Sequence, residues 1–570
     1  MRKTFIFMLA LVLCLSTVIS GCGAVAGNNT TAAASGRDTV ASTTAAGTDN
    51  GLSELGTFPL VKEKTTITAF IGWGTQTDIA QNWNTTEYEK KTNVHVEWQT
   101  AAGADAREKR ALILASGDLP DVFINGYVSF TPADEMQYGS QGSIIPLNGL
   151  IENNSIYLKK ILGDNPVYKN IITCSDGNIY SLPDFNVCYH CNFSQKMWVN
   201  VSWLKNLNLA MPKTTDEFEQ MLKAFKEKDP NGNGKADEMP LVSTTDGWHY
   251  QLDGFLMNAF VYSDGDTHLA LNNGSIEMTA VKPEFKEGLK YLNRLYSEKL
   301  LAPQSFTTNA SSLEKLNESG GAEVVGAVPG GANYIFAGGP AVSKRWQDYD
   351  ILPPITGPSG FVATPNYSAT RDVGTGYFSV SKAAKNPELI LRWIDWLYSD
   401  EGTLWHDGSG GREGIDYRKA NADELGLNGQ PAKYVQLAAK KPEDNVVWEQ
   451  FFPGFRTKEF RDTWKAPQDW HSDDPMAPEA QLYQGSRAYE AVAPKADQSM
   501  PNLFISSDKL SDYTRIKTGI DDYIKETVVS FIVGKMDLEK DWDSYVSKLN
   551  SIGLNDYLKM CQEAYDAQFK

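Results

Sequence analysis

The sequence lacks the features of several large classes of protein. Basic residues do not predominate, because 53 Lys and Arg stand against 71 Asp and Glu and give a net charge of −18. Nucleic acids and anionic membrane surfaces require clustered Lys and Arg, so we expect neither as a direct partner. The one long apolar run lies at the N-terminus, which excludes a polytopic membrane protein. A length of 570 residues allows two or three core-sized units, or one large two-lobed body.

Cysteine is also scarce. Outside the N-terminal segment the sequence has Cys174, Cys188, Cys191 and Cys561, too few for a disulfide scaffold in a body of this size. On an extended segment, residues 188 and 191 would face opposite ways, so we do not expect joint metal ligation or a redox motif from this pair. Whether any of these cysteines form disulfides is left open by the sequence.

The N-terminus has the pattern of an export signal. Arg2 and Lys3 precede an apolar run from Phe5 to Ile19 that is short for a membrane span. Ser20 and Gly21 then precede Cys22, which resembles the lipobox of bacterial lipoproteins, where the peptide is cut before an acylated cysteine. The alternative is an ordinary signal with an incidental cysteine. We expect a signal peptide at 1–21, lipidation of Cys22, and anchoring at the extracytoplasmic face of the cell membrane.

The segment 22–56 follows as a linker. From residue 23 to about residue 57 there is no Trp, Tyr, Ile or Met, and small or polar residues predominate. Such a composition cannot bury enough apolar area to offset the entropy lost on ordering. We expect a flexible tether with a reach of roughly 30–35 Å by random-coil scaling.

Alternating apolar patterns predict an α/β fold for the first part of the body. Strands are expected at 65–71, 94–98 and 121–124, with helices between them and a stop at Gly117. The order β-α-β-α-β favours a parallel sheet, whose ligands bind beyond the carboxyl ends of its strands. This rule places Trp73 and Asn125 at a binding edge. The later part is expected to be richer in helix, including 214–225 and much of 518–569.

A Gly- and Asn-rich loop carries the clearest local chemistry. Oxygen-bearing side chains alternate in it, a glycine is sixth, and two acids come near its end: the residues concerned are Asp229, Asn231, Asn233, Gly234, Lys235 (through its carbonyl), Asp237 and Glu238. Calcium takes six to eight oxygens, which alternate residues of a tight loop can supply. The loop resembles an EF-hand but has Pro240 at its twelfth position instead of Glu. We predict a structural calcium site; the alternative is a plain surface turn.

Several motifs in order along the chain resemble one family. They are the segments 179–183, 203–209, 212–218, the loop from Asp229, and the segments 376–382, 386–388 and 396–402. Their order resembles that of the extracellular solute-binding proteins of ABC transporters. The likeness is to the larger, calcium-containing members that bind oligosaccharides, of the LipO lipoprotein and alginate-binding kind. It covers nearly all of the chain after the signal.

The resemblance implies a two-lobed α/β fold with a hinge and a ligand cleft between the lobes. It places 57–182 plus 321–373 in an N-terminal lobe and 183–320 plus 374–570 in a helix-rich C-terminal lobe. Hinge crossings then fall near Pro183, Gly320 and Gly374. The lobes would close on the ligand, and a permease would recognise the closed form. The protein is expected to be a monomer, not an enzyme.

An oligosaccharide ligand needs flat aromatic faces for its C–H surfaces and polar partners for its hydroxyls. The 14 Trp and 25 Tyr are a large supply, most of which will be core. The aromatic candidates, chosen at loop edges beside polar residues, are Trp73, Trp248, Tyr250, Tyr334 and Trp405. The polar candidates are Asn125, Asp184, Asn186 and Arg412.

Two other functions stay open. A secreted hydrolase or lyase acting on glycans would need two opposed carboxylates, and acidic residues are plentiful. However, the sequence has no Gly-x-Ser-x-Gly elbow, phosphate loop or His-Glu-x-x-His pair, and its six histidines are scattered. A peptide-binding or sensory lipoprotein could share the architecture. Neither the sugar, its linkage nor its length follows from the sequence.

Overall fold

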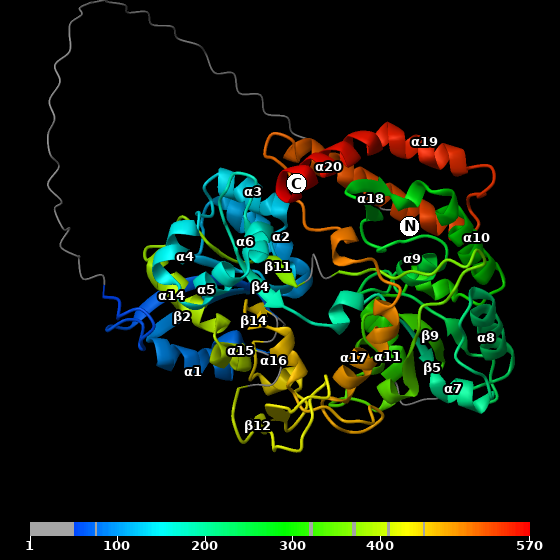
Figure 1. Cartoon of the computed structure of the whole chain (residues 1–570), viewed down its shortest axis with the longest axis horizontal. Coiled ribbons are helices and arrows are strands. Elements are labelled where there is room, and N and C mark those ends of the chain that lie inside the picture. Colours follow the sequence, from blue (N-terminus) through cyan, green and yellow to red (C-terminus); the bar gives the residue numbers. More distant parts are fainter. Residues whose placement is uncertain (1–50, 74–76, 319–322, 368–371, 407–410, 449–450) are drawn as a thin grey trace, which may run out of the picture. The chain divides into compact units, whose positions relative to one another are not determined.

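The computed structural model describes residues 51–73, 77–318, 323–367, 372–406, 411–448 and 451–570 (Figure 1). Cys22 and the signal peptide predicted before it lie outside the described residues. Among the described helices, none combines the length and the apolarity required to cross a bilayer. Two main sheets, each with its own hydrophobic core, organise the described part.

The first sheet has six strands in the order β14-β4-β11-β3-β1-β2. Its strands are β1 (Thr65–Gly72), β2 (Val94–Ala101), β3 (Val122–Ile124), β4 (Leu182–Asn186), β11 (Val373–Val380) and β14 (Phe455–Arg456). Strand β1 pairs in parallel with both β2 and β3, which confirms the predicted β-α-β-α-β unit. Strand β11 enters from much later in the chain and runs antiparallel between β3 and β4.

Helices cover the first sheet, and local signals set several of their ends. They are α1 (Trp83–Thr92), α2 (Gly103–Ser116), α3 (Pro132–Ser140), α4 (Asn148–Asn154), α5 (Tyr157–Asp164), α6 (Pro166–Ile172), α14 (Pro387–Asp395) and α15 (Asp400–His406). Gly117 ends α2 with a φ of 78°, the left-handed conformation expected of a C-terminal glycine. The Asn386 side chain accepts the backbone N–H of Leu389 and so begins α14.

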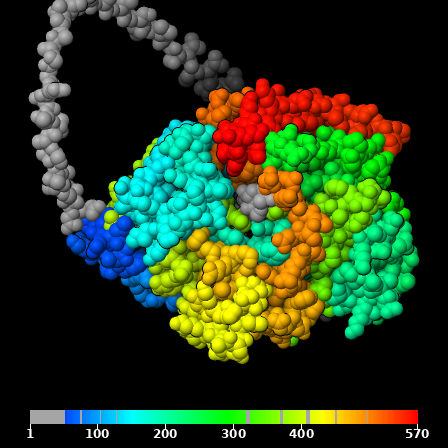
Figure 2. Space-filling model, in the orientation of Figure 1, coloured from blue at the N-terminus to red at the C-terminus, as the bar shows by residue number. Residues whose placement is uncertain are grey.

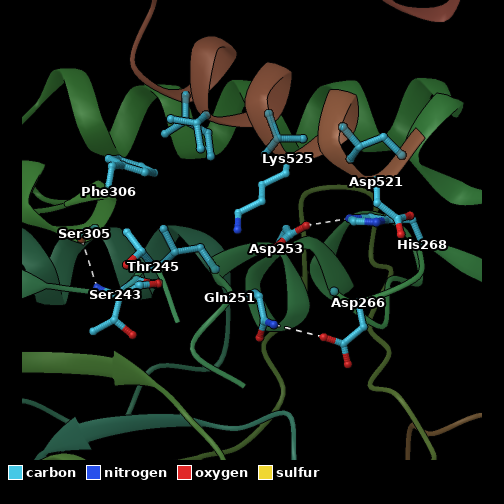
Figure 3. A pocket seen from close by; sticks show the side chains of 17 residues that line it. Ser243, Thr245, Gln251, Asp253, Asp266, His268, Ser305, Phe306, Asp521 and Lys525 are labelled. Atoms are coloured by element: carbon cyan, nitrogen blue, oxygen red, sulfur yellow. Dashed lines mark hydrogen bonds and ion pairs between the residues drawn. The ribbon is translucent and has the colours of Figure 1, made fainter. Parts of the chain in front are cut away.

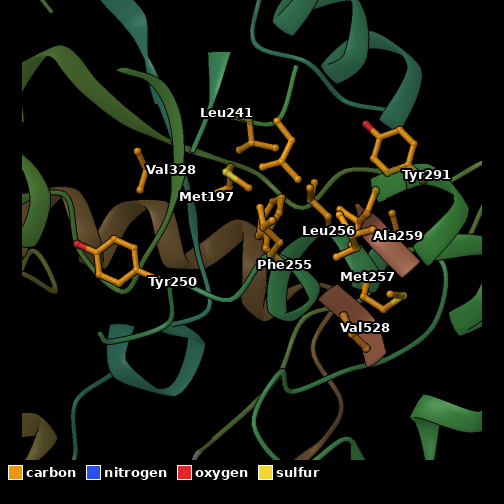
Figure 4. Close-up of a cluster of buried hydrophobic side chains, with 14 of the residues drawn as sticks. Met197, Leu241, Tyr250, Phe255, Leu256, Met257, Ala259, Tyr291, Val328 and Val528 are labelled. Carbon is orange, nitrogen blue, oxygen red and sulfur yellow. The ribbon is translucent and has the colours of Figure 1, made fainter. Parts of the chain in front are cut away.

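The second sheet has four strands in the order β10-β5-β9-β6. They are β5 (Met197–Asn200), β6 (Met239–Leu241), β9 (Val325–Pro329) and β10 (Tyr349–Leu352). Large buried side chains fill the space between this sheet and its helices, as Figure 4 shows for Met197, Leu241 and Phe255. Each large apolar side chain that is buried in this way stabilises the fold by about 1.5–3 kcal/mol. The second sheet therefore has a substantial hydrophobic core, separate from that of the first sheet.

The remaining elements belong mostly to this second part. Its helices are α7 (Val201–Asn206), α8 (Thr215–Glu227), α9 (Leu252–Phe255), α10 (Pro283–Ser297), α11 (Ala310–Glu318), α12 (Tyr334–Ala337), α16 (Lys458–Asp462), α17 (Ala477–Glu490), α18 (Leu510–Ile532), α19 (Trp542–Ile552) and α20 (Leu554–Phe569). Two hairpin-like pairs, β7 (Leu269–Asn272) with β8 (Ser275–Met278) and β12 (Tyr417–Lys419) with β13 (Tyr434–Gln436), complete it. At the start of α8, the Thr214 side chain accepts the N–H of Glu217, and the Glu217 carboxylate accepts the N–H of Lys213.

The strand pairing differs from the expected division into lobes. The segment 321–373, expected in the N-terminal lobe, supplies β9 and β10 to the second sheet, while β11 and β14 from 374–570 lie in the first. The chain therefore passes between the sheets after β4, after β10 and after β14. Gly320, the expected second crossing, lies outside the described residues. The apolar pattern of a short strand does not encode which of two sheets it joins.

A segment near the C-terminus also reaches the first lobe. Phe504 is 2% exposed and packs in a cluster of first-lobe residues that includes Phe130 and Met136. Its backbone N–H donates to Gln568 of α20 at 2.9 Å. In Figures 1 and 2 the C-terminal helices (red) accordingly lie next to α3 (cyan). The two lobes are thus joined at a second place besides the crossing segments.

We expect Phe504→Ala to destabilise the protein by about 3–5 kcal/mol, because it leaves a cavity in this cluster. Phe569→Ala, at a position that is 38% exposed, is the control and should cost less than about 1 kcal/mol. Urea denaturation followed by tryptophan fluorescence measures both. Equal midpoints for the two variants would contradict the packing described here.

Candidate functional site

The crossing segments lie side by side at the junction of the lobes. The N–H of Asn186 donates to the carbonyl of Asp372 at 2.9 Å, and the N–H of Tyr367 donates to the carbonyl of Asn192 at 2.9 Å. The N–H of Val187 donates to the carbonyl of Arg456 at 2.9 Å. Main-chain hydrogen bonds therefore join the first crossing to the second and to the third.

An aromatic pair stands beside this hinge. The ring of Tyr367 stacks on His249 with centroids 5.3 Å apart and an interplanar angle of 29°. The Tyr367 hydroxyl donates to the carbonyl of Asp264 at 2.8 Å, and His249 Nε2 lies 2.7 Å from Ser194 Oγ. The second crossing is thus fixed to the second lobe by side chains as well as by the main chain.

Buried polar atoms with unused hydrogen-bonding capacity gather along the crossings. Within the described part of the chain, Asp372 Oδ1, Asn192 Oδ1 and Thr364 Oγ1 are buried and have no hydrogen-bond partner. Burial raises the pKa of Asp372 to about 6, against the opposite effect of the Asn192 amide. Native proteins leave few buried polar groups unpaired, so such a group is a candidate for contact with a ligand or water.

A cavity of about 480 Å³ opens between elements of both lobes; we call it the interlobe cavity. Thr131 and Ala133, at the start of α3, line it from the first lobe. From the other side it is lined by Tyr262, Tyr367 and Asn366, together with residues of α18 and α20. Phenol rings beside amide and carboxylate groups can hold a polar molecule that also has apolar faces.

Two of the predicted ligand residues meet around an aromatic residue that the sequence analysis missed. Trp405 lies 5.3 Å from Trp83 between ring centroids, and the Arg412 guanidinium lies 5.5 Å from the Trp83 ring. Arg412 is held by the buried carboxylate of Asp416 at 2.7 Å. Trp83 opens α1 and carried no signal beyond its position in an Asn-rich stretch. Trp73 is buried and packs against Phe451 with centroids 4.8 Å apart.

A second group of predicted residues meets at the end of β9. Half-buried Trp248 packs so closely on Gly331 that a side chain there would come within 2.2 Å of the indole. The hydroxyl of buried Tyr250 donates to the carbonyl of Ile335 at 3.3 Å, within α12, which Tyr334 begins. These three aromatic residues therefore lie around one turn of the second lobe.

The remaining polar candidates take part in contacts within the protein. Asn125 is buried, accepts from Arg110 at 2.9 Å and donates to the carbonyl of Gly376 at 2.8 Å. Asp184 forms a buried ion pair with Arg456 at 2.7 Å. Asn186 accepts from Arg461 at 3.2 Å. A role of these residues in ligand binding stays a prediction.

The cysteine pair departs from expectation. Cys188 and Cys191 form a disulfide, because the segment turns into a short 3-10 helix, 190–193, instead of running extended. In such a turn residues three apart lie on the same side, so the expectation that they face opposite ways was wrong. The disulfide lies within the first crossing segment. Cys174 and Cys561 are buried free thiols.

The Asp229 loop folds around its own oxygens. The two carboxylate oxygens of Asp229 accept the N–H groups of Asn233 and Gly234 at 3.1 and 3.0 Å. Gly234 has a φ of 73°, which confirms the predicted sharp turn at the sixth position. The amides of Asn231 and Asn233 donate to Asp237 at 3.3 and 3.0 Å.

The loop also has the electrostatics of a cation site. Glu238 Oε1 is buried and has no hydrogen-bond partner in the described part of the protein. Burial raises the pKa of Glu238, and the charges of Asp237 and Asp229 raise it further. A buried carboxylate oxygen beside two other acids is a position that a hard cation would stabilise. The residues present therefore fit calcium, with Lys235 able to add its carbonyl.

Comparisons with known proteins agree with this geometry. Residues 73–404 match the family of bacterial extracellular solute-binding proteins. The fructooligosaccharide ABC transporter substrate-binding protein FusA of Streptococcus pneumoniae serotype 4 is 31% identical over 499 residues, which cover 84% of this chain and 85% of that protein. Lipoprotein LipO of Bacillus subtilis strain 168 is 23% identical over 488 residues, or 84% of this chain and 88% of LipO. An EF-hand mutant of S. pneumoniae FusA, solved in complex with fructo-nystose, has a TM-score of 0.74 and 27% identity, covering 88% of this chain and 99% of that one.

We expect Asp372→Asn to stabilise the protein at pH 7 and to have no such effect at pH 4. The folded pKa of about 6 lies above the unfolded value of about 3.9, so between these values the folded state keeps a proton that the unfolded state releases. Stability due to this group therefore falls as pH rises from about 4 to 6. The variant should gain up to about 3 kcal/mol at pH 7, measured by denaturation at both pH values. Asp423→Asn, an exposed position, is the control; equal behaviour of the two variants would contradict the argument.

Proposed function

The chain belongs to the family of bacterial extracellular solute-binding proteins, and we propose that it captures an oligosaccharide between its lobes and delivers it to the permease of an ABC transporter. Members of this family bind solutes and do not convert them, so the chain is a binding protein and not an enzyme. The interlobe cavity is the observation that carries the proposal, because elements of both lobes line it next to the hinge.

The chemistry of the site supports a sugar as the solute. The tyrosine rings that line the interlobe cavity suit the C–H faces of a sugar, and the amide and hydroxyl groups beside them suit its hydroxyls. FusA, which is 31% identical, is a fructooligosaccharide-binding protein, and this supports oligosaccharides as the class. None of the predicted residues lines the interlobe cavity itself, but Trp248 packs on His249, which stacks on Tyr367 of its wall. We propose ligand contact outside that cavity for the partly exposed Trp248, Tyr334, Trp405, Arg412 and Asn186. We assign no ligand contact to Trp73, Asn125, Asp184 and Tyr250, because their side chains are buried within the protein.

We also propose that Cys22 carries the lipid that holds the protein at the outer face of the cell membrane. The lipobox-like sequence supports this, and so does the similarity to lipoprotein LipO. The segment 22–56 would keep the body close to its permease without embedding it. The body is a monomer in this proposal.

Calcium is the proposed resident cation of the Asp229 loop. Asp229, Asn231, Asn233, Asp237 and Glu238 would hold it through side chains and Lys235 through its carbonyl. The similarity to a FusA structure described as an EF-hand mutant supports this. The loop joins the end of α8 to β6, and Asn231 donates to the carbonyl of Glu323 at 2.9 Å beside β9, so the ion would stabilise the second sheet.

Isothermal titration calorimetry against a panel of neutral oligosaccharides and short peptides tests the function. We expect micromolar or tighter binding of at least one oligosaccharide, no binding of peptides, and no change of the sugar on chromatography after incubation. Trp248→Ala should weaken binding at least tenfold by removing an aromatic face, while Phe569→Ala should not. Binding of peptides alone, or cleavage of the sugar, would overturn the proposal.

Removal of calcium should lower the melting temperature reversibly. A bound ion stabilises by about 2.7 kcal/mol at one hundred times its dissociation constant, a shift that calorimetry detects. We expect EDTA to lower the melting temperature, Ca²⁺ to restore it, and Mg²⁺ to restore it poorly. The double variant Asp237→Asn, Glu238→Gln should show no response. Asn428→Ala, in another Gly- and Asn-rich turn, should respond like the wild type, and loss of the response there would count against the assignment.

A further inference from the structure

A second cavity, which we call the α18 cavity, lies within the second lobe. It has a volume of about 400 Å³ and opens between α18 and the segments after β6 and α9. Figure 3 shows Lys525 reaching from α18 into this cavity, with Thr245, Gln251 and Asp253 on the opposite walls. Its size falls in the lower part of the roughly 300–1,000 Å³ range of small-molecule pockets.

Two polar side chains of the α18 cavity, Lys525 and Gln251, have hydrogen-bonding capacity that no described residue fills. Among the described residues, Lys525 makes no hydrogen bond or ion pair, so its ammonium group has three free donors. Gln251 Oε1 is buried without a hydrogen-bond partner, while the amide of the same side chain donates to Asp266 at 3.0 Å. A free ammonium group and an amide with an unused acceptor thus lie on the walls of one cavity, and a ligand that carries both donors and acceptors can use such walls.

The charges of the cavity favour a neutral ligand. His268 pairs with Asp253 at 2.8 Å, Lys517 pairs with Asp521, and Asp266 accepts the Gln251 amide at 3.0 Å. An anion would approach the carboxylates of the wall, and a cation would approach Lys525. Phe306 and the apolar face of α18 form another wall. A neutral polyhydroxyl molecule with apolar C–H faces matches all of these groups.

The α18 cavity and the interlobe cavity share one wall. Asp264, Thr267 and Leu269 line the interlobe cavity, whereas Gly265 and His268 line the α18 cavity. Asp266 is exposed and lines both, so it lies at the rim where the two spaces adjoin. A chain molecule that crosses this rim can place successive units in the two cavities.

We propose that the α18 cavity is an accessory saccharide pocket, which holds further units of a neutral oligosaccharide whose first units lie in the interlobe cavity. This inference rests on the proposed function and adds a preference for ligand length to it. Short oligosaccharides fill only the interlobe cavity and do not contact Lys525. Longer members gain contacts with Lys525, Gln251 and Phe306 across the rim at Asp266.

Calorimetric titration with inulin-type fructo-oligosaccharides of increasing length, from the trisaccharide kestose upward, tests the pocket. The wild type should bind longer members more tightly. Lys525→Ala should weaken binding of the longer members about tenfold, since it removes charge-assisted hydrogen bonds, and should change kestose binding less than twofold. Thr245→Trp, which fills the cavity from an exposed position, should have the same selective effect.

Lys535→Ala is the matched control, because it removes one exposed lysine outside the cavity. It should bind every length like the wild type. If both cavity variants keep the length dependence of the wild type, or weaken all lengths equally, the accessory pocket is wrong while the proposed function stands. If the wild type binds neither these sugars nor any oligosaccharide of the panel, the proposed function itself is wrong.

Discussion

Two separate hydrophobic cores in one chain are the constraint on which the rest of the structure depends. Each sheet is completed by strands from far along the sequence, so the chain must pass between the lobes after β4, after β10 and after β14. The buried pair of Asp184 and Arg456 holds the last of these passages, where β14 joins the edge of the first sheet. Removing one partner of such a pair leaves a buried charge, at a cost of about 3–5 kcal/mol.

The three crossing segments are joined to one another by hydrogen bonds, but some of their buried polar atoms have no hydrogen-bond partner among the described residues. Main-chain hydrogen bonds join the segments that contain Asn186, Asp372 and Arg456, so the three crossing segments are held next to one another. Asp372 and Asn192 nevertheless retain buried oxygens without partners. A ligand or water that satisfies these atoms would stabilise the arrangement in which they are buried. Binding sites commonly carry such a local loss of stability, because the groups that recognise a ligand cannot all be satisfied within the protein.

Local signals were reliable where neighbouring residues decide the conformation. The parallel unit β1–β3, the end of α2 at Gly117 and the turn at Gly234 follow from periodicity and from glycine's access to positive φ. The assignment of 321–373 to the N-terminal lobe was wrong, because β9 and β10 pair with strands of the second sheet that lie far away in the sequence. The pattern of candidate residues was informative only in part: Trp405 and Arg412 meet, but around Trp83, which no motif marked.

The sequence by itself determined the family, the α/β class, the net negative charge and the oxygen-rich loop from Asp229. Each of these depends on residue type and short spacing. Only the tertiary structure decided which strands share a sheet, that Cys188 and Cys191 are joined, and that the α18 cavity adjoins the interlobe cavity at Asp266. The strand order and the shared cavity wall arise from packing between segments distant in the chain, whereas the disulfide joins two residues of one local turn. Their free energy comes from burial of apolar surface, which is not directional and therefore leaves no short motif.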